Sequence, residues 1–191
     1  MQSKNKLAIF DLDGTLFDTE EIHFLSYQKA LQEIGIELER EYFAKKCSGR
    51  HYKAFLSVIL ETKGLADESQ IEAVHDRKIE LYAELIHTAR ENCFLFDVIT
   101  AIKSEYYIAC ATTASKKNVM GILNAYKRTE LFDLILTQED VVKAKPDPEA
   151  FLRAASHFQI PISEAVIFED SETGLSAARA SGAKVIKIES W

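Results

Sequence analysis

The chain has 191 residues, 47% of them apolar, and its 23 basic and 30 acidic side chains give a formal net charge of −7 at neutral pH. This composition is typical of a globular protein and excludes collagen-like, low-complexity and wholly disordered chains. Because the basic residues are scattered and no apolar run approaches the roughly 18 residues that span a bilayer, we expect a cytoplasmic protein without a nucleic-acid or membrane partner.

The first predicted element is a buried strand at Leu7–Phe10, which leads directly into Asp11 and Asp13. Side chains two residues apart in extended backbone point the same way, so both carboxylates project from the end of this strand. Carboxylates that lie so close repel each other unless a cation or proton intervenes, and oxygen ligands suit Mg2+. The pair therefore predicts a magnesium site, the alternative being a solvated Asp-Gly turn at Gly14.

From Thr19 to about Thr88 the apolar residues follow helical spacing, and no segment has the pattern of a strand. One helical stripe ends at Gly35, a second ends near Gly64, and a long third stripe follows Asp67. We therefore expect residues 19–88 to form an all-helical domain, inserted between residues 1–18 and residues 89–191 of a second domain.

Beyond residue 88, short apolar runs alternate with helical patterns. The expected strands are Tyr106–Ala111, Leu134–Leu136, Ala165–Phe168 and Lys184–Ile188, and the expected helices are Asp97–Lys103, Lys116–Tyr126, Pro148–Phe158 and Thr173–Ser181. Such alternation predicts βαβ units and an α/β fold with a doubly wound, Rossmann-like parallel sheet.

Polar residues follow three of these later strands at their carboxyl ends. They are Thr112 after the first strand, Lys145 in the loop after the second, and Glu169 and Asp170 after the third. Because active sites of open parallel sheets lie at this edge, a hydroxyl, a cation and a second acidic pair are expected to meet the first carboxylate pair. This convergence argues against the solvated-turn alternative.

These residues carry a resemblance to a known family. Asp11-Leu12-Asp13-Gly14-Thr15, Thr112, Lys145-Pro146 and Glu169-Asp170-Ser171 resemble, in order, the four motifs of the haloacid-dehalogenase-like hydrolase superfamily. The helical insertion resembles the cap domain of the branch that contains sugar-phosphate phosphatases and β-phosphoglucomutases. The resemblance covers essentially the whole chain and implies a Mg2+-dependent phosphatase of small phosphorylated metabolites, with sugar phosphates as the expected substrates.

The resemblance also implies catalytic roles. Asp11 would attack phosphorus to form an aspartyl-phosphate, and Asp13 would protonate the leaving oxygen and then activate water. Thr112 would hold phosphoryl oxygens, Thr113 would contact the substrate, and Lys145 would neutralise charge shared between the nucleophile and the phosphate.

The metal ligands implied by the resemblance are the carboxylates of Asp11 and Asp170 and the carbonyl of Asp13. Glu169 would bind Mg2+ either directly or through water. Lys145 is chosen over Lys143 because it precedes proline, as in the family pattern, and Lys143 is expected in solvent.

Residues of the helical domain are the expected substrate contacts. Thr19 and His23 lie one helical turn apart and share a face, and Gly49-Arg50 resembles the specificity loop of the cap. The alternatives are a surface or packed histidine and a plain interhelical turn. Lys78 is expected on a solvated helix face.

Two alternative functions remain open at this point. One is a β-phosphoglucomutase-like phosphomutase, which returns the phosphoryl group to the sugar. The other is a non-enzymatic phospho-acceptor module resembling response-regulator receivers, although receivers lack a large helical insertion and need no residue in the role of Asp13. The sequence indicates nothing about the oligomeric state.

Overall fold

The computed structural model describes residues 4–48 and 50–189. The chain divides into two compact units: a core unit, Met1–Asp18 with Arg90–Trp191, and a helical unit, Thr19–Ala89. Among the described residues, every helix is too short or too polar to cross a lipid bilayer. The expected cytoplasmic location stays a prediction.

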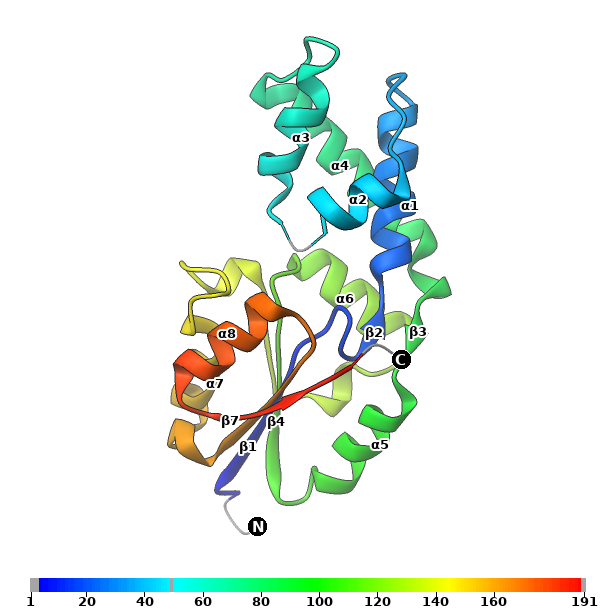
Figure 1. The fold of residues 1–191 in the computed structure, drawn as a ribbon. Coiled ribbons are helices and arrows are strands. Elements are labelled where there is room, and N and C mark those ends of the chain that lie inside the picture. The colour runs from blue at the N-terminus through cyan, green and yellow to red at the C-terminus, as the bar shows by residue number, and fades with distance from the viewer. Residues whose placement is uncertain (1–3, 49, 190–191) are drawn as a thin grey trace. The chain divides into compact units, whose positions relative to one another are not determined.

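The core unit contains a five-stranded parallel sheet with the order β5-β4-β1-β6-β7 (Figure 1). Its strands are β1 (Lys6–Phe10), β4 (Tyr106–Ala111), β5 (Leu134–Leu136), β6 (Ala165–Glu169) and β7 (Lys184–Lys187). The central strand β1 is buried on both faces, and its residue Leu7 lies opposite Tyr107 on one side and Ala165 on the other. The strand order reverses at β1, which is where open parallel sheets bind ligands.

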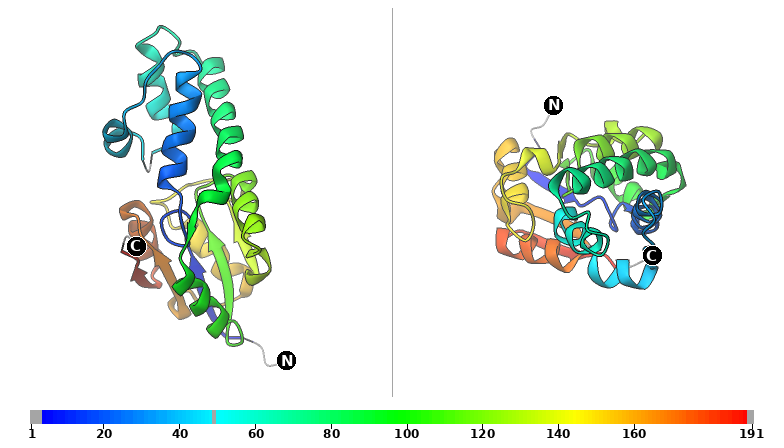
Figure 2. Two further views of the ribbon diagram at one scale, coloured as in Figure 1. Left: turned by 90° about the vertical axis from the view of Figure 1, so that its right-hand side faces the viewer. Right: turned by 90° about the horizontal axis from the view of Figure 1, so that it is seen from above.

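Helices cover both faces of this sheet, α7 and α8 lying on one side and α5 and α6 on the other (Figures 1 and 2). The core-unit helices are α5 (Cys93–Ile102), α6 (Lys116–Ala125), α7 (Glu149–Phe158) and α8 (Glu172–Ser181), with short 3-10 helices η2 (Thr129–Leu131), η3 (Gln138–Asp140) and η4 (Ile162–Glu164). Small residues of α7 and α8, among them Ala154 and Ala178, pack against Ile9 and Ile167 of the sheet. The predicted fold class is confirmed.

Three features of the core unit differ from the sequence-based predictions. Helix α5 begins at Cys93 rather than Asp97, because the Asn92 side chain accepts a hydrogen bond from Leu95 N (3.2 Å) and thereby caps an earlier turn. Helix α7 begins at Glu149 rather than Pro148, and Pro148 occupies the N-cap position. The short antiparallel strands β2 (Phe17–Asp18) and β3 (Arg90–Glu91) were not expected, because two residues show no periodicity.

The helical unit consists of α1 (Glu20–Gln32), α2 (Arg40–Lys46), α3 (Tyr52–Glu61), α4 (Glu68–Leu85) and the 3-10 helix η1 (Ile86–Thr88). Its apolar core joins the stripes of these helices and includes Leu31, Leu56 and Leu81. Gly35 and Gly64 follow α1 and α3 with φ of +74° and +69°, a conformation that glycine adopts without strain. The seven-residue α2 was missed, because it buries only Phe43.

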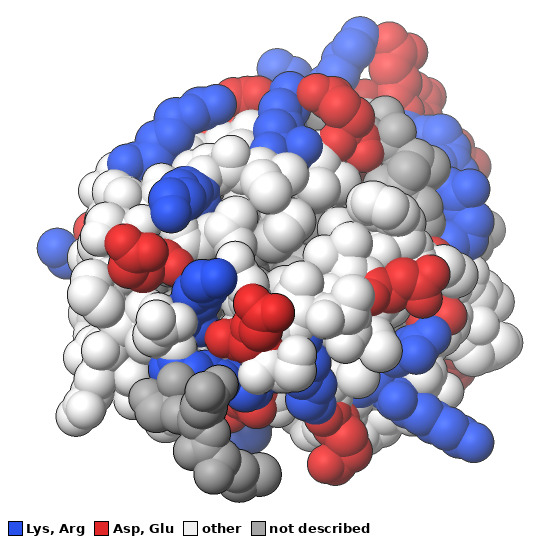
Figure 3. All heavy atoms as spheres, turned by 90° about the horizontal axis from the view of Figure 1, so that it is seen from below, with Lys and Arg blue, Asp and Glu red and all other residues white. Residues whose placement is uncertain are grey.

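The charged surface of the core unit is mixed. On the face shown in Figure 3, basic and acidic side chains are interspersed. Ion pairs such as Lys4 with Asp133 (3.5 Å) and Lys6 with Glu105 (3.8 Å) join opposite charges in this unit.

Candidate active site at the carboxyl edge of the sheet

Asp11 and Glu169 lie side by side because their strands are paired up to their ends. Phe10 of β1 is opposite Phe168 of β6, and Asp11 N donates a hydrogen bond to Phe168 O (3.0 Å). Lys145 arrives from the loop after β5, and its Nζ donates to Asp11 Oδ1 (2.6 Å) and to Glu169 Oε2 (2.7 Å). The side chains of all three are at most 8% exposed. A buried ammonium therefore bridges two buried carboxylates at the switch point of the sheet.

Lys143, the competing lysine, lies in solvent as expected. Its side chain is 71% exposed, and its Nζ is 3.7 Å from Asp147 Oδ2. The backbone N–H groups of Val142 and Lys143 both donate to the Glu149 carboxylate, which holds this loop at the start of α7. The loop geometry thus directs Lys145, and not Lys143, to the sheet edge.

Asp170 completes a cluster of carboxylates. One carboxylate oxygen from each of Asp11, Glu169 and Asp170 lies within 4.8 Å of the others. Thr15 Oγ1 donates to Asp170 Oδ1 (2.8 Å). Gly14 has a φ of +86°, and a Cβ placed on it would lie 2.2 Å from Asp170 Oδ2. Glycine at this turn therefore both permits the backbone conformation and leaves room for the Asp170 carboxylate.

The Asp13 carboxylate is not part of this three-carboxylate cluster. Asp13 lies in the turn that follows β1, where Gly14 N donates to Phe17 O (2.7 Å) and Asp13 forms an isolated bridge with Phe17. The expected metal contribution of Asp13 is its carbonyl oxygen, and this stays a prediction.

The electrostatics of the cluster favour a bound cation. Burial raises the pKa of Asp11 well above its usual range, and the charge of Glu169 acts in the same direction, while Lys145 opposes both. Burial also raises the pKa of Asp170, against the hydrogen bond from Thr15. Burial alone would lower the pKa of Lys145, but the two carboxylates that it contacts raise it. Three carboxylates thus lie beside one ammonium, which contacts two of them, and a set of hard oxygen donors with excess negative charge fits Mg2+.

Ser171 fixes the remaining oxygen of Glu169. Both Ser171 N (3.1 Å) and Ser171 Oγ (2.8 Å) donate to Glu169 Oε1, and the same hydroxyl accepts a hydrogen bond from Gly174 N at the start of α8. Thr15 and Ser171 belong to the motif segments of the sequence, but their contacts with the acidic residues were not predicted. The available signal was their residue type, since a hydroxyl beside a carboxylate cluster can orient it.

The two candidate threonines after β4 differ in environment. Thr112 is buried, its N donates to Leu136 O (3.1 Å), and its Oγ1 accepts a hydrogen bond from Ala114 N (3.1 Å). Because that contact uses an oxygen lone pair, the hydroxyl proton of Thr112 is left for another acceptor. Thr113 is exposed. The expected contacts of both residues with a substrate stay predictions.

In the helical unit, the expectation that Lys78 lies on a solvated face is wrong. Lys78 is 3% exposed, its Nζ lies 2.8 Å from His23 Nδ1, and it stacks over the Tyr82 ring at 4.4 Å. The reason is its spacing, because Lys78 falls on the buried stripe of α4 that includes Val74 and Leu81. An ammonium only donates, so His23 accepts at Nδ1.

The other expected substrate contacts of this unit are Thr19, Gly49 and Arg50. Thr19 is buried at the start of α1, and its carbonyl accepts a hydrogen bond from His23 N (2.9 Å). Arg50 is exposed just before α3. Gly49 lies outside the described residues.

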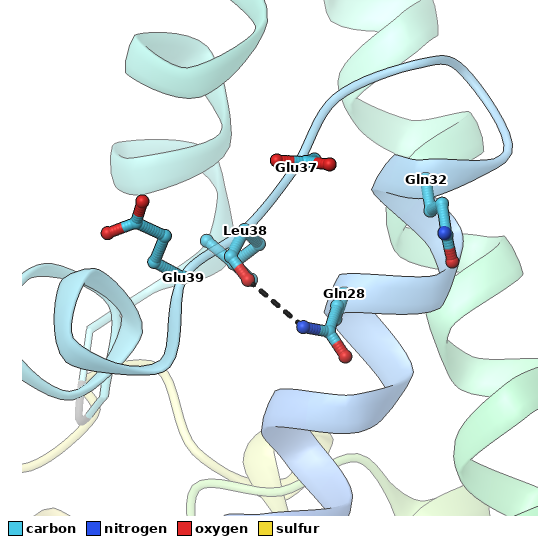
Figure 4. Close-up of a pocket in the computed structure, with 5 residues that line it drawn as sticks. All are labelled: Gln28, Gln32, Glu37, Leu38 and Glu39. Atoms are coloured by element: carbon cyan, nitrogen blue, oxygen red, sulfur yellow. Dashed lines mark hydrogen bonds between the residues drawn. The ribbon is translucent and has the colours of Figure 1, made fainter.

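The helical unit also has a groove of about 320 Å³ (Figure 4). It is lined by Gln28, Gln32, Glu37, Leu38 and Glu39. Gln28 Nε2 donates to Leu38 O (3.2 Å) across it, and both glutamates are exposed. None of the expected site residues lines this groove.

Comparison with known proteins agrees with this architecture. The family model described as haloacid dehalogenase-like hydrolase matches residues 8–188. The phosphorylated carbohydrates phosphatase of Thermotoga maritima is 28% identical over 178 residues, covering 92% of this chain and 81% of the relative. The beta-phosphoglucomutase of Bacillus subtilis is 30% identical over 184 residues, covering 93% and 80%.

A solved structure has the same fold. The crystal structure of CbbY from Rhodobacter sphaeroides in complex with xylulose-(1,5)bisphosphate is 27% identical and superposes with a TM-score of 0.86. The superposition covers 97% of this chain and 87% of that chain.

Proposed function

The chain belongs to the family of haloacid dehalogenase-like hydrolases, and from this premise we propose that it is a Mg2+-dependent phosphatase of small phosphorylated metabolites. The observation that carries the proposal is the buried bridge from Asp11 through Lys145 to Glu169, with Asp170 beside it. Membership of a hydrolase family argues against the phospho-acceptor alternative.

In the proposed reaction, a carboxylate oxygen of Asp11 attacks phosphorus, and the bond between phosphorus and the ester oxygen breaks. Asp13 gives its proton to that leaving oxygen, then takes a proton from the water that hydrolyses the aspartyl-phosphate. Lys145 and the Thr112 hydroxyl stabilise the charge on the phosphoryl oxygens. Phosphoryl transfer depends mainly on such positioning and charge stabilisation.

The metal would be held by the carboxylates of Asp11 and Asp170 and by the carbonyl of Asp13, with Glu169 bound directly or through water. A bound Mg2+ would offset the negative charge of the carboxylates and of the incoming phosphate. The fit rests on the donor set, which consists of oxygen ligands with more negative charge than Lys145 balances.

Sugar phosphates are the proposed substrates. This rests on the Thermotoga maritima relative, whose name gives phosphorylated carbohydrates as its substrates. Thr19, His23, Arg50 and Gly49 of the helical unit, together with Thr113 of the core unit, are the proposed substrate contacts.

The test is phosphate release from p-nitrophenyl phosphate and from a panel of sugar phosphates, with Mg2+ and with a chelator. We expect sustained turnover that needs Mg2+ and that disappears in Asp11→Asn. Absence of turnover on every substrate at saturating Mg2+ would contradict the proposal.

A phosphomutase is the second candidate, because the Bacillus subtilis relative at 30% identity is a beta-phosphoglucomutase. The two activities share the nucleophile and differ in what the phosphoryl group meets next. Incubation with β-glucose 1-phosphate and a trace of the bisphosphate separates them, since a mutase yields glucose 6-phosphate and a phosphatase yields free phosphate.

A further inference from the structure

Gly174 occupies the first turn of α8, next to the acidic cluster. It is buried, and a Cβ placed on it would lie 2.1 Å from Glu169 Cδ, 2.2 Å from Oε2 and 2.4 Å from Oε1. Glycine is a poorer helix residue than alanine. A glycine at this helical position therefore costs helix propensity and leaves room for one specific group, the Glu169 carboxylate.

The carboxylate that fills this space is held at both oxygens. Ser171 donates to Oε1 through its backbone N–H and its hydroxyl, and Lys145 donates to Oε2. The ammonium of Lys145 in turn reaches Asp11 Oδ1. The position of the Lys145 charge thus depends on where the Glu169 carboxylate lies.

We propose that Gly174 is a positioning residue for the reaction, an inference that rests on the proposed phosphatase function. Its missing side chain admits the Glu169 carboxylate, and that carboxylate holds Lys145 against the nucleophile Asp11. A methyl group at residue 174 displaces the carboxylate. Because the three atoms nearest to that methyl are the end of a flexible side chain and not backbone, the backbone can stay in place, while the ammonium loses its second partner and keeps Asp11.

The experiment measures kcat and KM for p-nitrophenyl phosphate with Mg2+, and the thermal unfolding midpoint, in the full chain. The variants are Gly174→Ala, Glu169→Asp and the double variant. Ser176→Ala is the matched control, because Ser176 is exposed on the same helix and this change also raises helix propensity. Glu169→Asp shortens the side chain that the new methyl would meet.

We expect Gly174→Ala to lower kcat by about 10- to 100-fold, the range for residues that orient a catalytic group through another residue. Its unfolding midpoint should fall by no more than about 6 °C, because Lys145 keeps Asp11 as a partner. KM should change less than kcat, because the displaced charge acts on the reacting group. In the Glu169→Asp background, adding Gly174→Ala should lower kcat by less than threefold, since the shorter aspartate side chain already relieves the clash.

The inference fails if Gly174→Ala keeps kcat within threefold of wild type. It also fails if the separate effects of the two substitutions on kcat multiply in the double variant. If Gly174→Ala does not fold, thermal unfolding is measured instead on the double variant Gly174→Ala/Glu169→Ala. A folded double variant supports a clash between the new methyl group and the Glu169 carboxylate, and an unfolded one overturns it. An inactive wild type alongside would instead mean that the proposed function has failed.

Discussion

The ammonium of Lys145 donates a 2.6 Å hydrogen bond to Asp11 Oδ1 across 134 residues of sequence. Both side chains are almost fully buried, at 5% and 8% exposure. A buried ion pair contributes little net stability compared with apolar packing, but removal of one partner leaves an uncompensated charge. The pair therefore has consequences for stability as well as for catalysis.

Replacing Lys145 with methionine should reduce the free energy of unfolding by about 3 kcal/mol, because two buried carboxylates lose their shared cation. Phosphatase turnover should fall by at least about a hundredfold. Urea unfolding and phosphate release measure the two effects. The matched control is Lys143→Met, an exposed lysine two residues earlier, which should shift stability by no more than about 0.5 kcal/mol. Equal effects of the two substitutions would contradict the assignment of Lys145.

Asp11→Asn and Asp13→Asn should each lower turnover by at least about a thousandfold, since one removes the nucleophile and the other the proton carrier. Asp11→Asn should leave the unfolding midpoint unchanged or higher, because it removes one charge from a site with excess negative charge. The same change at the exposed Asp97 is the control. Wild-type turnover by either site variant would remove the basis of the proposed mechanism.

The strands were largely predictable because buried parallel strands are short apolar runs with clear ends. All five predicted strands of the core sheet are present, with ends that differ by at most one residue. What escaped prediction depends on contacts between distant segments. The pairing of β2 with β3, in which Phe17 faces Glu91, joins segments separated by the whole helical unit. The burial of Lys78 was obscured by residue type, although its spacing on α4 indicated it.

In the site, too, positions at strand ends were predictable, and contacts between distant segments were not. Asp11, Lys145 and Glu169 could be placed together because each comes at or after the end of a strand. The contribution of Thr15 could not, because its hydroxyl reaches Asp170 across 155 residues and only coordinates give that distance. Sequence pattern thus locates the edge of the sheet, and the side-chain geometry within the site requires the structure.

Thr15→Val should weaken Mg2+ binding about tenfold, because it removes the hydroxyl that holds Asp170 Oδ1 while keeping the side-chain volume. Titration calorimetry with MgCl2 on the substrate-free protein measures this without reference to turnover. Thr15→Ser retains the hydroxyl and should bind within about threefold of wild type. If valine and serine at residue 15 bind Mg2+ equally, the hydrogen bond to Asp170 has no part in holding the metal.

The helical unit should lose stability in mild acid because of His75. Its ring stacks on Tyr52 at 3.6 Å, its Nδ1 lies 3.0 Å from the Tyr27 hydroxyl, and burial, aided by the charge of Lys78, lowers its pKa to about 4. An unfolded histidine has a pKa of about 6.5, so between these values the unfolded chain binds more protons and stability falls as pH falls.

NMR titration of the His75 ring should therefore give a pKa well below 6, and thermal unfolding measured from pH 7 to pH 5 should show the linked loss of stability. His75→Phe retains an aromatic ring on Tyr52 but cannot take up a proton, so its unfolding midpoint should decline less over this range. The remaining histidines contribute equally to both proteins, and the difference between the two curves isolates His75. Parallel curves, or a ring that titrates near 6.5, would show that the folded helical unit leaves His75 as protonatable as it is in the unfolded chain.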